Sequence, residues 1–150
     1  TLSRSSAASD VYKRQTLDPK LGVVRKDDQE LVVADIPGLI EDAHKGDGLG
    51  FKFLKHIERC HSIIHVIDVT DEDVKKSYNT ITSELNNYDG NITKKNKIVV
   101  LNKCDLIDKE EIKIKKNILE NETQLQVYTI STITGEGVSN LINHILIIKN

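Results

Sequence analysis

The apolar residues of this chain follow two different spacings. Nearly continuous apolar runs, such as those at 63–69 and 98–101, are typical of strands buried in a parallel sheet. In other stretches apolar residues recur every three or four positions, as at Val74, Tyr78 and Ile81, which predicts amphipathic helices. Strands are expected at 21–25, 30–35, 63–69, 98–101 and 125–130. Helices are expected between them, at 48–59, through Val74 and Leu85, and from Asp108 to about Leu119. A last helix follows the final strand and contains Val138, Leu141, Ile142, Ile145 and Leu146.

Strands that alternate with helices predict an α/β domain with a mostly parallel sheet and flanking helices. The first two strands are the exception, because they are expected to form a hairpin around Lys26-Asp27-Asp28-Gln29. Two helix starts carry polar capping residues: Asp71 lies near one of them, and Asp108 with Glu111 forms a capping box at the other.

Composition narrows the class of protein. The chain has 150 residues, of which 29% are charged and 38% hydrophobic, with a net charge of −2. A charge this small indicates neither a membrane surface nor bulk nucleic acid as a partner. Cys60 and Cys104 form no disulfide framework and the histidines have no metal-binding spacing, so we expect reduced thiols and a cytoplasmic location.

The run at 98–101 leads directly into Asn102-Lys103-Cys104-Asp105. Guanine presents two donors on one edge, and an ionised Asp105 offers two matching acceptor oxygens. Adenine lacks this donor pair, so the carboxylate would be left unpaired against it. Asn102 can donate to the base or hold neighbouring loops, and the stem of Lys103 can lie flat over the ring. Taken alone, the four residues could equally form a polar turn.

A second strand end carries Asp35-Ile36-Pro37-Gly38. Asp35 at this place can hold Mg²⁺ through a water molecule, because Mg²⁺ keeps much of its hydration shell. The N–H of Gly38 can approach a γ-phosphate closely, since no side chain intervenes. Asp-x-Pro-Gly is also ordinary turn chemistry, but its pairing with the guanine motif favours a phosphate site.

A third polar segment, Ser131-Thr132-Ile133, follows the expected strand at 125–130. In GTPases a Ser-Ala-x loop at this place supports guanine with main-chain N–H groups, and here Thr132 replaces the usual Ala. By itself Ser131 would be read as an ordinary turn residue.

The three motifs in this order resemble those of the Obg family of bacterial GTPases. The segment at 16–24, Thr-Leu-Asp-Pro-Lys-Leu-Gly-Val-Val, is similar to the first switch of that family. The segment at 35–50 is similar to its second switch, and 53–59 is similar to the helix that follows. Asp42 stands where the family commonly has Gly.

The resemblance implies the P-loop NTPase fold of a Ras-like GTPase G domain. It also implies GTP and GDP as ligands, Mg²⁺ as cofactor, slow hydrolysis of GTP, and a switch role in assembly of the large ribosomal subunit through contacts with that subunit and its RNA. The intact protein would be a monomer that does not bind membranes. Leu39 stands where Ras-type enzymes carry a water-orienting Gln, so no catalytic side chain is assigned. The implied GTP-binding residues are Thr16, Leu17, Asp35, Ile36, Pro37, Gly38, Asn102, Lys103, Cys104, Asp105, Ser131, Thr132 and Ile133, with Thr16 and Asp35 as the metal ligands.

The sequence printed here contains no G-x-x-x-x-G-K-[ST] motif, which would cradle the α- and β-phosphates. We therefore expect residues 16–150 to be a partial Obg-type G domain without its first strand, phosphate loop and first helix. Residues 1–15 are polar and match no Obg segment, and they resemble translated adapter sequence or a disordered leader.

Other interpretations remain open at this point. The chain could be a ribosome- or RNA-binding module that needs no nucleotide, or a non-functional fragment, and the missing phosphate motif favours this alternative. It could also come from a developmentally regulated GTP-binding protein, a neighbouring family.

Overall fold

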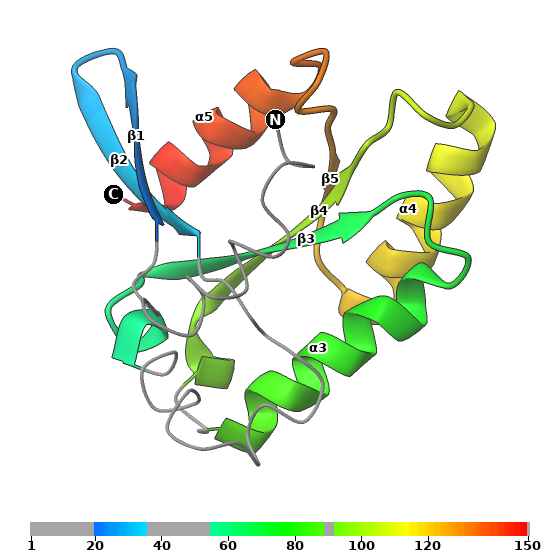
Figure 1. Ribbon diagram of the computed structural model, residues 1–150, viewed down its shortest axis with the longest axis horizontal. Coiled ribbons are helices and arrows are strands. Elements are labelled where there is room, and N and C mark those ends of the chain that lie inside the picture. The colour runs from blue at the N-terminus through cyan, green and yellow to red at the C-terminus, as the bar shows by residue number, and fades with distance from the viewer. Residues whose placement is uncertain (1–19, 36–54, 89–91, 150) are drawn as a thin grey trace, which may run out of the picture.

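The computed structural model describes residues 20–35, 55–88 and 92–149 of the chain (Figure 1). The elements within them are β1 (Lys20–Lys26), β2 (Gln29–Asp35), β3 (Ser62–Asp68), α3 (Val74–Tyr88), a 3-10 turn (Ile92–Lys94), β4 (Asn96–Asn102), α4 (Lys109–Thr123), β5 (Val127–Thr129) and α5 (Val138–Lys149).

The first two strands form the predicted antiparallel hairpin. Its register pairs Lys26 with Gln29, which leaves a loop of two residues, Asp27 and Asp28. Both have positive φ, 49° and 62°, as a type I′ turn requires. Aspartate tolerates this left-handed backbone better than most side chains, so the turn fixes the pairing of the two strands.

The other three strands form a parallel sheet in the order β3-β4-β5. The apolar run of the central strand, β4, is buried at all four positions, 98–101, as predicted. β3 is an edge strand of this sheet, and Val66 on it is 54% exposed. The expected burial of 63–69 is confirmed only in part: Ile67 is 3% exposed, whereas Val66 points to the opposite face of the sheet. β5 is shorter than the expected 125–130.

Helix boundaries depend on capping side chains. The predicted cap of α4 is confirmed, because Asp108 Oδ1 accepts a hydrogen bond of 2.8 Å from the N–H of Glu111. At α3 the capping residue is Asp73, which accepts from the N–H of Lys76 at 2.9 Å. Asp71, which the sequence favoured, accepts instead from the hydroxyl of Ser77. The observed capping residue therefore lies two positions after the expected one, in the same polar loop.

The hydrophobic core lies on both faces of β4. Val99 and Leu101 face α3 and α4 and contact residues such as Tyr78 and Leu119. Ile98 and Val100 face the opposite way and pack against α5. Alternate residues of a strand point to opposite faces, so one run of four apolar residues supplies both halves of the core.

The helix expected at 48–59 is described only from residue 55 onward, where residues 55–58 are helical. Ile57 in this turn is 2% exposed and packs with Leu85 and Ile92 in a separate apolar cluster. The end of the turn is fixed by Lys95, whose ammonium donates to the carbonyls of Glu58 and Cys60.

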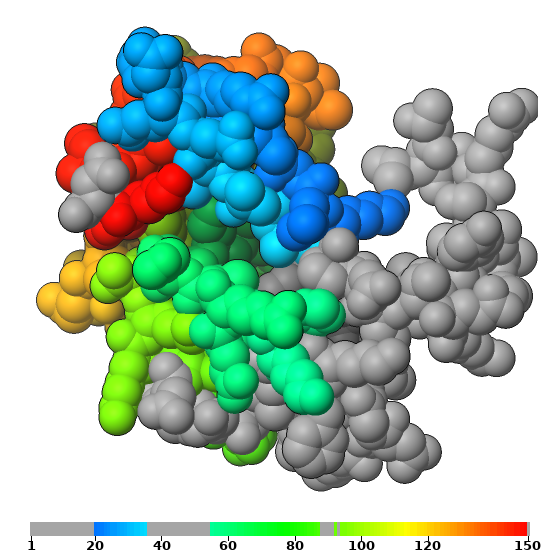
Figure 2. All heavy atoms as spheres, turned by 90° about the vertical axis from the view of Figure 1, so that its left-hand side faces the viewer, coloured from blue at the N-terminus to red at the C-terminus, as the bar shows by residue number. Residues whose placement is uncertain are grey.

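The hairpin lies against α5 rather than alongside the parallel sheet (Figure 2). Lys26 Nζ donates to Asn143 Oδ1 at 2.5 Å and to Ser139 Oγ at 3.3 Å. Near the other end of α5, Lys149 Nζ donates to the carbonyl of Glu30. Within the described part of the chain, β2 and β3 therefore belong to separate sheets.

Candidate nucleotide-binding site

The carboxyl ends of the three parallel strands bring the candidate polar residues to one edge of the sheet. β3 ends at Asp68, β4 ends at Asn102, and Ser131 follows β5 by two residues. The register pairs Asp68 with Asn102 directly. Ligands of open α/β sheets bind outside this edge of the strands, so the fold places these residues where a ligand would be expected.

The carboxylate of Asp105 is held by a buried hydroxyl. Ser131 Oγ donates to Asp105 Oδ1 at 2.8 Å. The same hydroxyl accepts from the N–H of Thr134 at 3.1 Å, and Ser131 has no exposed surface. Asp105 is exposed. One carboxylate oxygen is thus fixed from within the protein while the group lies at the surface.

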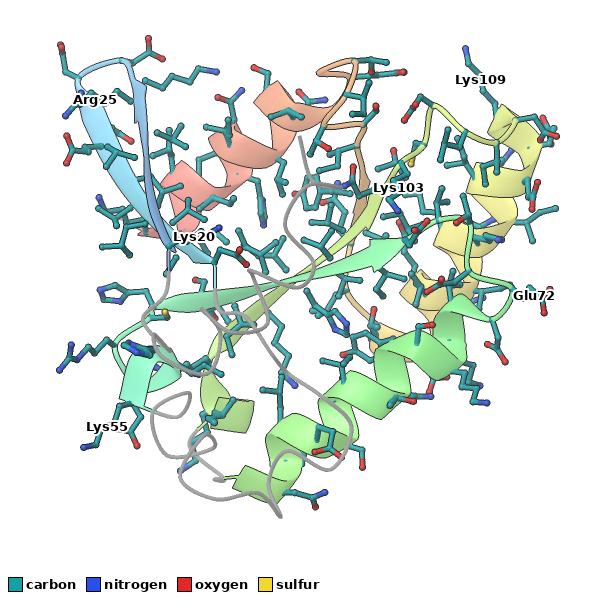
Figure 3. All side chains as sticks on the ribbon, viewed as in Figure 1. Lys20, Arg25, Lys55, Glu72, Lys103 and Lys109 are labelled. Atoms are coloured by element: carbon teal, nitrogen blue, oxygen red, sulfur yellow. The ribbon has the colours of Figure 1, made fainter. Side chains whose placement is uncertain are left out.

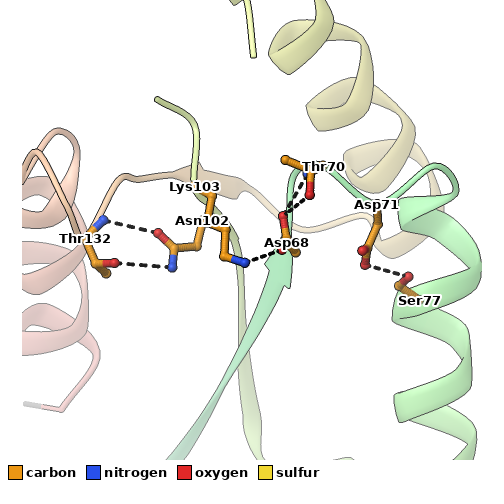
Figure 4. A network of polar contacts seen from close by, with 7 residues as sticks. All are labelled: Asp68, Thr70, Asp71, Ser77, Asn102, Lys103 and Thr132. Atoms are coloured by element: carbon orange, nitrogen blue, oxygen red, sulfur yellow. Dashed lines mark hydrogen bonds and ion pairs between the residues drawn. The ribbon is translucent and has the colours of Figure 1, made fainter. Parts of the chain in front are cut away.

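The amide of Asn102 is oriented by the loop after β5. The N–H of Thr132 donates to Asn102 Oδ1 at 3.2 Å, and Asn102 Nδ2 lies 3.5 Å from the Thr132 hydroxyl (Figure 4). The first contact uses the backbone and would exist with alanine at this position. The longer second contact exists only because the residue is Thr132.

Lys103 forms an ion pair with the end of β3. Its ammonium lies 2.6 Å from Asp68 Oδ2, and Asp68 Oδ1 accepts from both the N–H and the hydroxyl of Thr70 (Figure 4). The hydrogen bond from Lys103 and then those from Thr70 lower the pKa of Asp68 from 3.8 to about 2. The same contact raises the pKa of Lys103.

Asp68 is a site residue that sequence reasoning missed. It lies within the apolar run at 63–69, which predicted only a strand. A signal was present, because Asp68 ends its strand just as Asn102 ends the next one.

Cys104 faces the protein rather than the edge of the sheet. Its N–H donates to the carbonyl of Ile130 at 3.1 Å, and the side chain packs against the core cluster below α3 and α4. Burial raises the pKa of its thiol. Any contribution of Cys104 to ligand binding would come from its backbone.

The loop after β5 folds back on itself around Ser131. The carbonyl of Ser131 accepts from the N–H of Gly135 at 2.8 Å, and its N–H donates to the carbonyl of Glu136 at 3.0 Å. Gly137 closes the loop with φ of 75°, and a Cβ there would lie 2.2 Å from the carbonyl oxygen of Thr129. Ile133 is 83% exposed at the tip.

Comparison with known proteins gives the family. The profile described as "50S ribosome-binding GTPase" matches residues 1–103. The chain belongs to this family. It is 52% identical over 140 residues to GTPase Obg of Rickettsia akari (strain Hartford), an alignment that covers 93% of this chain and 42% of that protein. The predicted Obg resemblance is confirmed, and the chain spans less than half the length of this relative.

Solved structures support the fold of this GTPase-family chain. Era in complex with MgGDPNP and a 16S ribosomal RNA segment superposes with a TM-score of 0.65 at 23% identity, over 87% of this chain and 44% of that chain. The FeoB G-domain from Methanococcus jannaschii gives 0.64 at 22% identity, over 91% and 82%. The predicted P-loop GTPase G-domain fold is confirmed.

Of the other predicted site residues, the structure describes only Asp35. Thr16, Leu17, Ile36, Pro37 and Gly38 lie outside the described residues. Asp35 is described and ends β2, where it is exposed and paired across the hairpin with Lys20.

The described residues hold neither a metal-binding cluster nor a helix that could span a membrane. No group of three or more His, Cys, Asp or Glu side chains among them could hold a metal ion. None of the helices in the described ranges is long and apolar enough to span a membrane.

Proposed function

We propose that this chain reads the guanine base of GTP and GDP in a protein that hydrolyses GTP with Mg²⁺ and acts as a switch in assembly of the large ribosomal subunit. Asp105 would accept from the two guanine donors, Asn102 would support the base and its loops, and Lys103 would cover the ring. Ser131, Thr132 and Ile133 would contribute main-chain N–H groups. The protein would work in the cytoplasm as a monomer that does not bind membranes.

The orientation of Asp105 carries this proposal. The hydroxyl of Ser131 fixes one oxygen at 2.8 Å, so the exposed carboxylate has a defined direction before any ligand arrives. A preoriented acceptor pair is what recognition of two adjacent donors needs, because less conformational freedom is lost on binding.

Mg²⁺ and the phosphates would be handled by the other motifs. Thr16 and Asp35 would hold the metal, with Asp35 acting through a water molecule, and Leu17, Ile36, Pro37 and Gly38 would line the phosphates. Asp35 is exposed at the end of β2 and therefore accessible to a hydrated cation. Bound Mg²⁺ would neutralise charge on the β- and γ-phosphates. No side chain is assigned as the catalytic base.

The ribosomal role rests on the family. Its description names binding to the 50S subunit, and the relatives of this chain are named GTPase Obg. We infer the large subunit and its RNA as partners from these names.

Base selectivity tests the proposal. In the full-length protein, Asp105→Asn should weaken GDP binding by about 2–4 kcal/mol, because a charge-assisted pair of hydrogen bonds is lost. It should also favour xanthosine diphosphate, whose edge presents an acceptor in place of the guanine amine. The control is Asp28→Asn, which removes the same charge from the exposed hairpin turn, where asparagine also tolerates positive φ.

Unchanged GDP affinity in Asp105→Asn would remove the guanine assignment. If the protein then associates with large ribosomal subunits equally well with and without GTP, it is a nucleotide-independent binding module instead. Titration calorimetry and sedimentation with purified subunits give the two readings.

A further inference from the structure

We propose that Asp68 is a positioning residue for guanine binding, which holds the ammonium of Lys103 so that the aliphatic stem of Lys103 forms a fixed surface for the base. The inference rests on the proposed function. Asp68 lies at the end of a different strand and would act through Lys103 rather than through contact with the nucleotide.

The carboxylate of Asp68 has a partner for each oxygen. Oδ2 lies 2.6 Å from Lys103 Nζ, while Oδ1 accepts from Thr70 N–H at 2.9 Å and from Thr70 Oγ1 at 2.6 Å. Thr70 therefore fixes the plane of the carboxylate, and the remaining oxygen determines where the ammonium lies. Figure 4 shows Lys103 reaching from the end of β4 across to Asp68 at the end of β3.

The stem of Lys103 is fixed at its other end too. The backbone of Lys103 has a φ of 67°, which residues other than glycine rarely adopt. Its carbonyl accepts a hydrogen bond from the N–H of Leu106 at 3.0 Å. A lysine side chain normally loses considerable rotamer freedom when a ligand orders it. Here both ends are set in advance, so less of that loss would fall on binding.

The loop that carries Asp68 is itself anchored. Lys115 of α4 donates from its ammonium to the carbonyls of Val69 and Asp71, both at 2.7 Å, and its side chain is only 12% exposed. The N–H of Val69 donates to the carbonyl of Asn102 at 3.0 Å. The position of Asp68 relative to the guanine motif is thus determined by the sheet and by α4.

The carboxyl group of Asp68 is ionised near neutral pH. Its contacts with Lys103 and Thr70 lower the pKa of this carboxyl to about 2, so it stays negative near neutrality. The side chains are 28% exposed for Asp68 and 51% for Lys103, so solvent screens the pair and the expected effect is moderate.

The test measures the affinity of the full-length protein for three nucleoside diphosphates. Asp68→Asn keeps the acceptor for Thr70 but removes the charge opposite Lys103. We expect it to weaken GDP, inosine diphosphate and xanthosine diphosphate by the same factor, about three- to tenfold, because the Lys103 stem packs on any purine ring. Asp105→Asn should instead change the ranking of the three bases.

A double-mutant cycle separates positioning from a structural role. Lys103→Met keeps an apolar stem without the charge, and in that background Asp68→Asn should have no further effect on nucleotide affinity. Thr70→Ala should weaken binding in the same direction by a smaller factor. Asp68→Glu, which keeps the charge, should recover part of the affinity that Asp68→Asn loses.

The matched control is Glu72→Gln, which removes the same charge from the loop just after Asp68. Figure 3 shows Glu72 at the outer end of this loop, away from Lys103. Its nucleotide affinity should equal that of the wild type.

The outcomes distinguish the two proposals. If Asp105→Asn changes base selectivity but Asp68→Asn binds all three diphosphates like the wild type, the role of Asp68 is overturned and the proposed function stands. Additive effects of Asp68→Asn and Lys103→Met overturn it too, because Asp68 would then act independently of Lys103. If wild-type protein shows no preference for guanine, the proposed function itself fails.

Discussion

Ser131 connects burial to recognition at the scale of a single residue. Its hydroxyl lies under the surface, donates to Asp105 and accepts from the loop N–H of Thr134. One side chain therefore orients the carboxylate that is proposed to read the base and holds the turn that would face the ligand.

Replacing this hydroxyl should affect nucleotide binding more than folding. Ser131→Ala leaves Asp105 unanchored, and we expect GDP affinity in the full-length protein to fall about tenfold, close to 1.4 kcal/mol for one hydrogen bond to a charged group. Titration calorimetry measures the change. Ser83→Ala, on the exposed face of α3, is the control; equal affinities in the two variants would contradict the role of Ser131.

His65 makes stability depend on pH. Its ring stacks on Tyr78 with a centroid distance of 5.2 Å. Burial, and secondly the charge of Lys97, lowers the pKa of His65 from 6.5 to about 4. The folded state thus binds fewer protons than the unfolded state between these values, so stability should fall as the pH drops from 6.5 to 4 and should be unaffected by His65 above 6.5.

Removing this titration should flatten the acid limb of the stability curve. His65→Phe keeps a stacked ring but cannot bind a proton. Compared with wild type, we expect its free energy of unfolding to be higher at pH 4 than at pH 7 by on the order of 2–3 kcal/mol, at 1.36 kcal/mol per pKa unit. Urea unfolding at pH 7, 5.5 and 4 measures this. His61→Gln, at an exposed position, is the control, and identical pH profiles for His65→Phe and wild type would refute the assignment.

The sequence singled out Asn102, Lys103 and Asp105. It also singled out Ser131 and Thr132, which hold two of them, but not Asp68, the partner of Lys103. Asn102, Lys103 and Asp105 form one short motif, so their chemistry can be read locally. Asp68 contacts Lys103 across 35 positions of sequence, and only the register of β3 against β4 brings the two together. Partner residues of this kind need the sheet before they can be found.

At the scale of elements, prediction succeeded where a local cause decides the structure. The hairpin follows from two aspartates that accept positive φ, and α4 begins where Asp108 caps it. The burial of β3 was predicted only in part, because an apolar run does not reveal whether both faces of a strand are covered: Ile67 is 3% exposed and Val66 is 54% exposed.

The connection between α4 and the β3–α3 loop gives a prediction about stability. Lys115→Met would leave the carbonyls of Val69 and Asp71 without their shared donor, and we expect a loss of about 1–3 kcal/mol in the free energy of unfolding. Denaturant titration measures it. Lys113→Met, on an exposed position of the same helix, should lie within about 0.5 kcal/mol of wild type; a similar loss in both would mean that charge rather than the loop contacts is responsible.

At the scale of the whole molecule, helix α5 contacts both sheets within the described residues. The hairpin contacts this helix through Lys26 and Lys149, while the parallel sheet packs on it through Ile98 and Val100. Among the described elements, this helix therefore contacts both the hairpin that ends at Asp35 and the strand that ends at Asn102.

This arrangement leads to a prediction for residues 1–150 expressed alone. Within the described residues β2 and β3 each have one sheet partner, and Val32 and Val66 on them are 58% and 54% exposed. Strand edges with exposed apolar side chains are templates for association. We therefore expect the 150 residues on their own to aggregate or to unfold with low cooperativity.

The same 150 residues should bind GTP weakly. They contain the motif at 102–105, which is proposed to read guanine, but no G-x-x-x-x-G-K-[ST] sequence. Contacts to the base would therefore have to supply nearly all of the affinity. We expect a Kd no tighter than about 1 mM, roughly −4 kcal/mol. Saturation-transfer NMR and calorimetry on soluble monomer measure this, with Asp105→Asn as the specificity control. Micromolar binding that Asp105→Asn abolishes would show that these residues hold the phosphates through groups that the sequence motifs do not reveal.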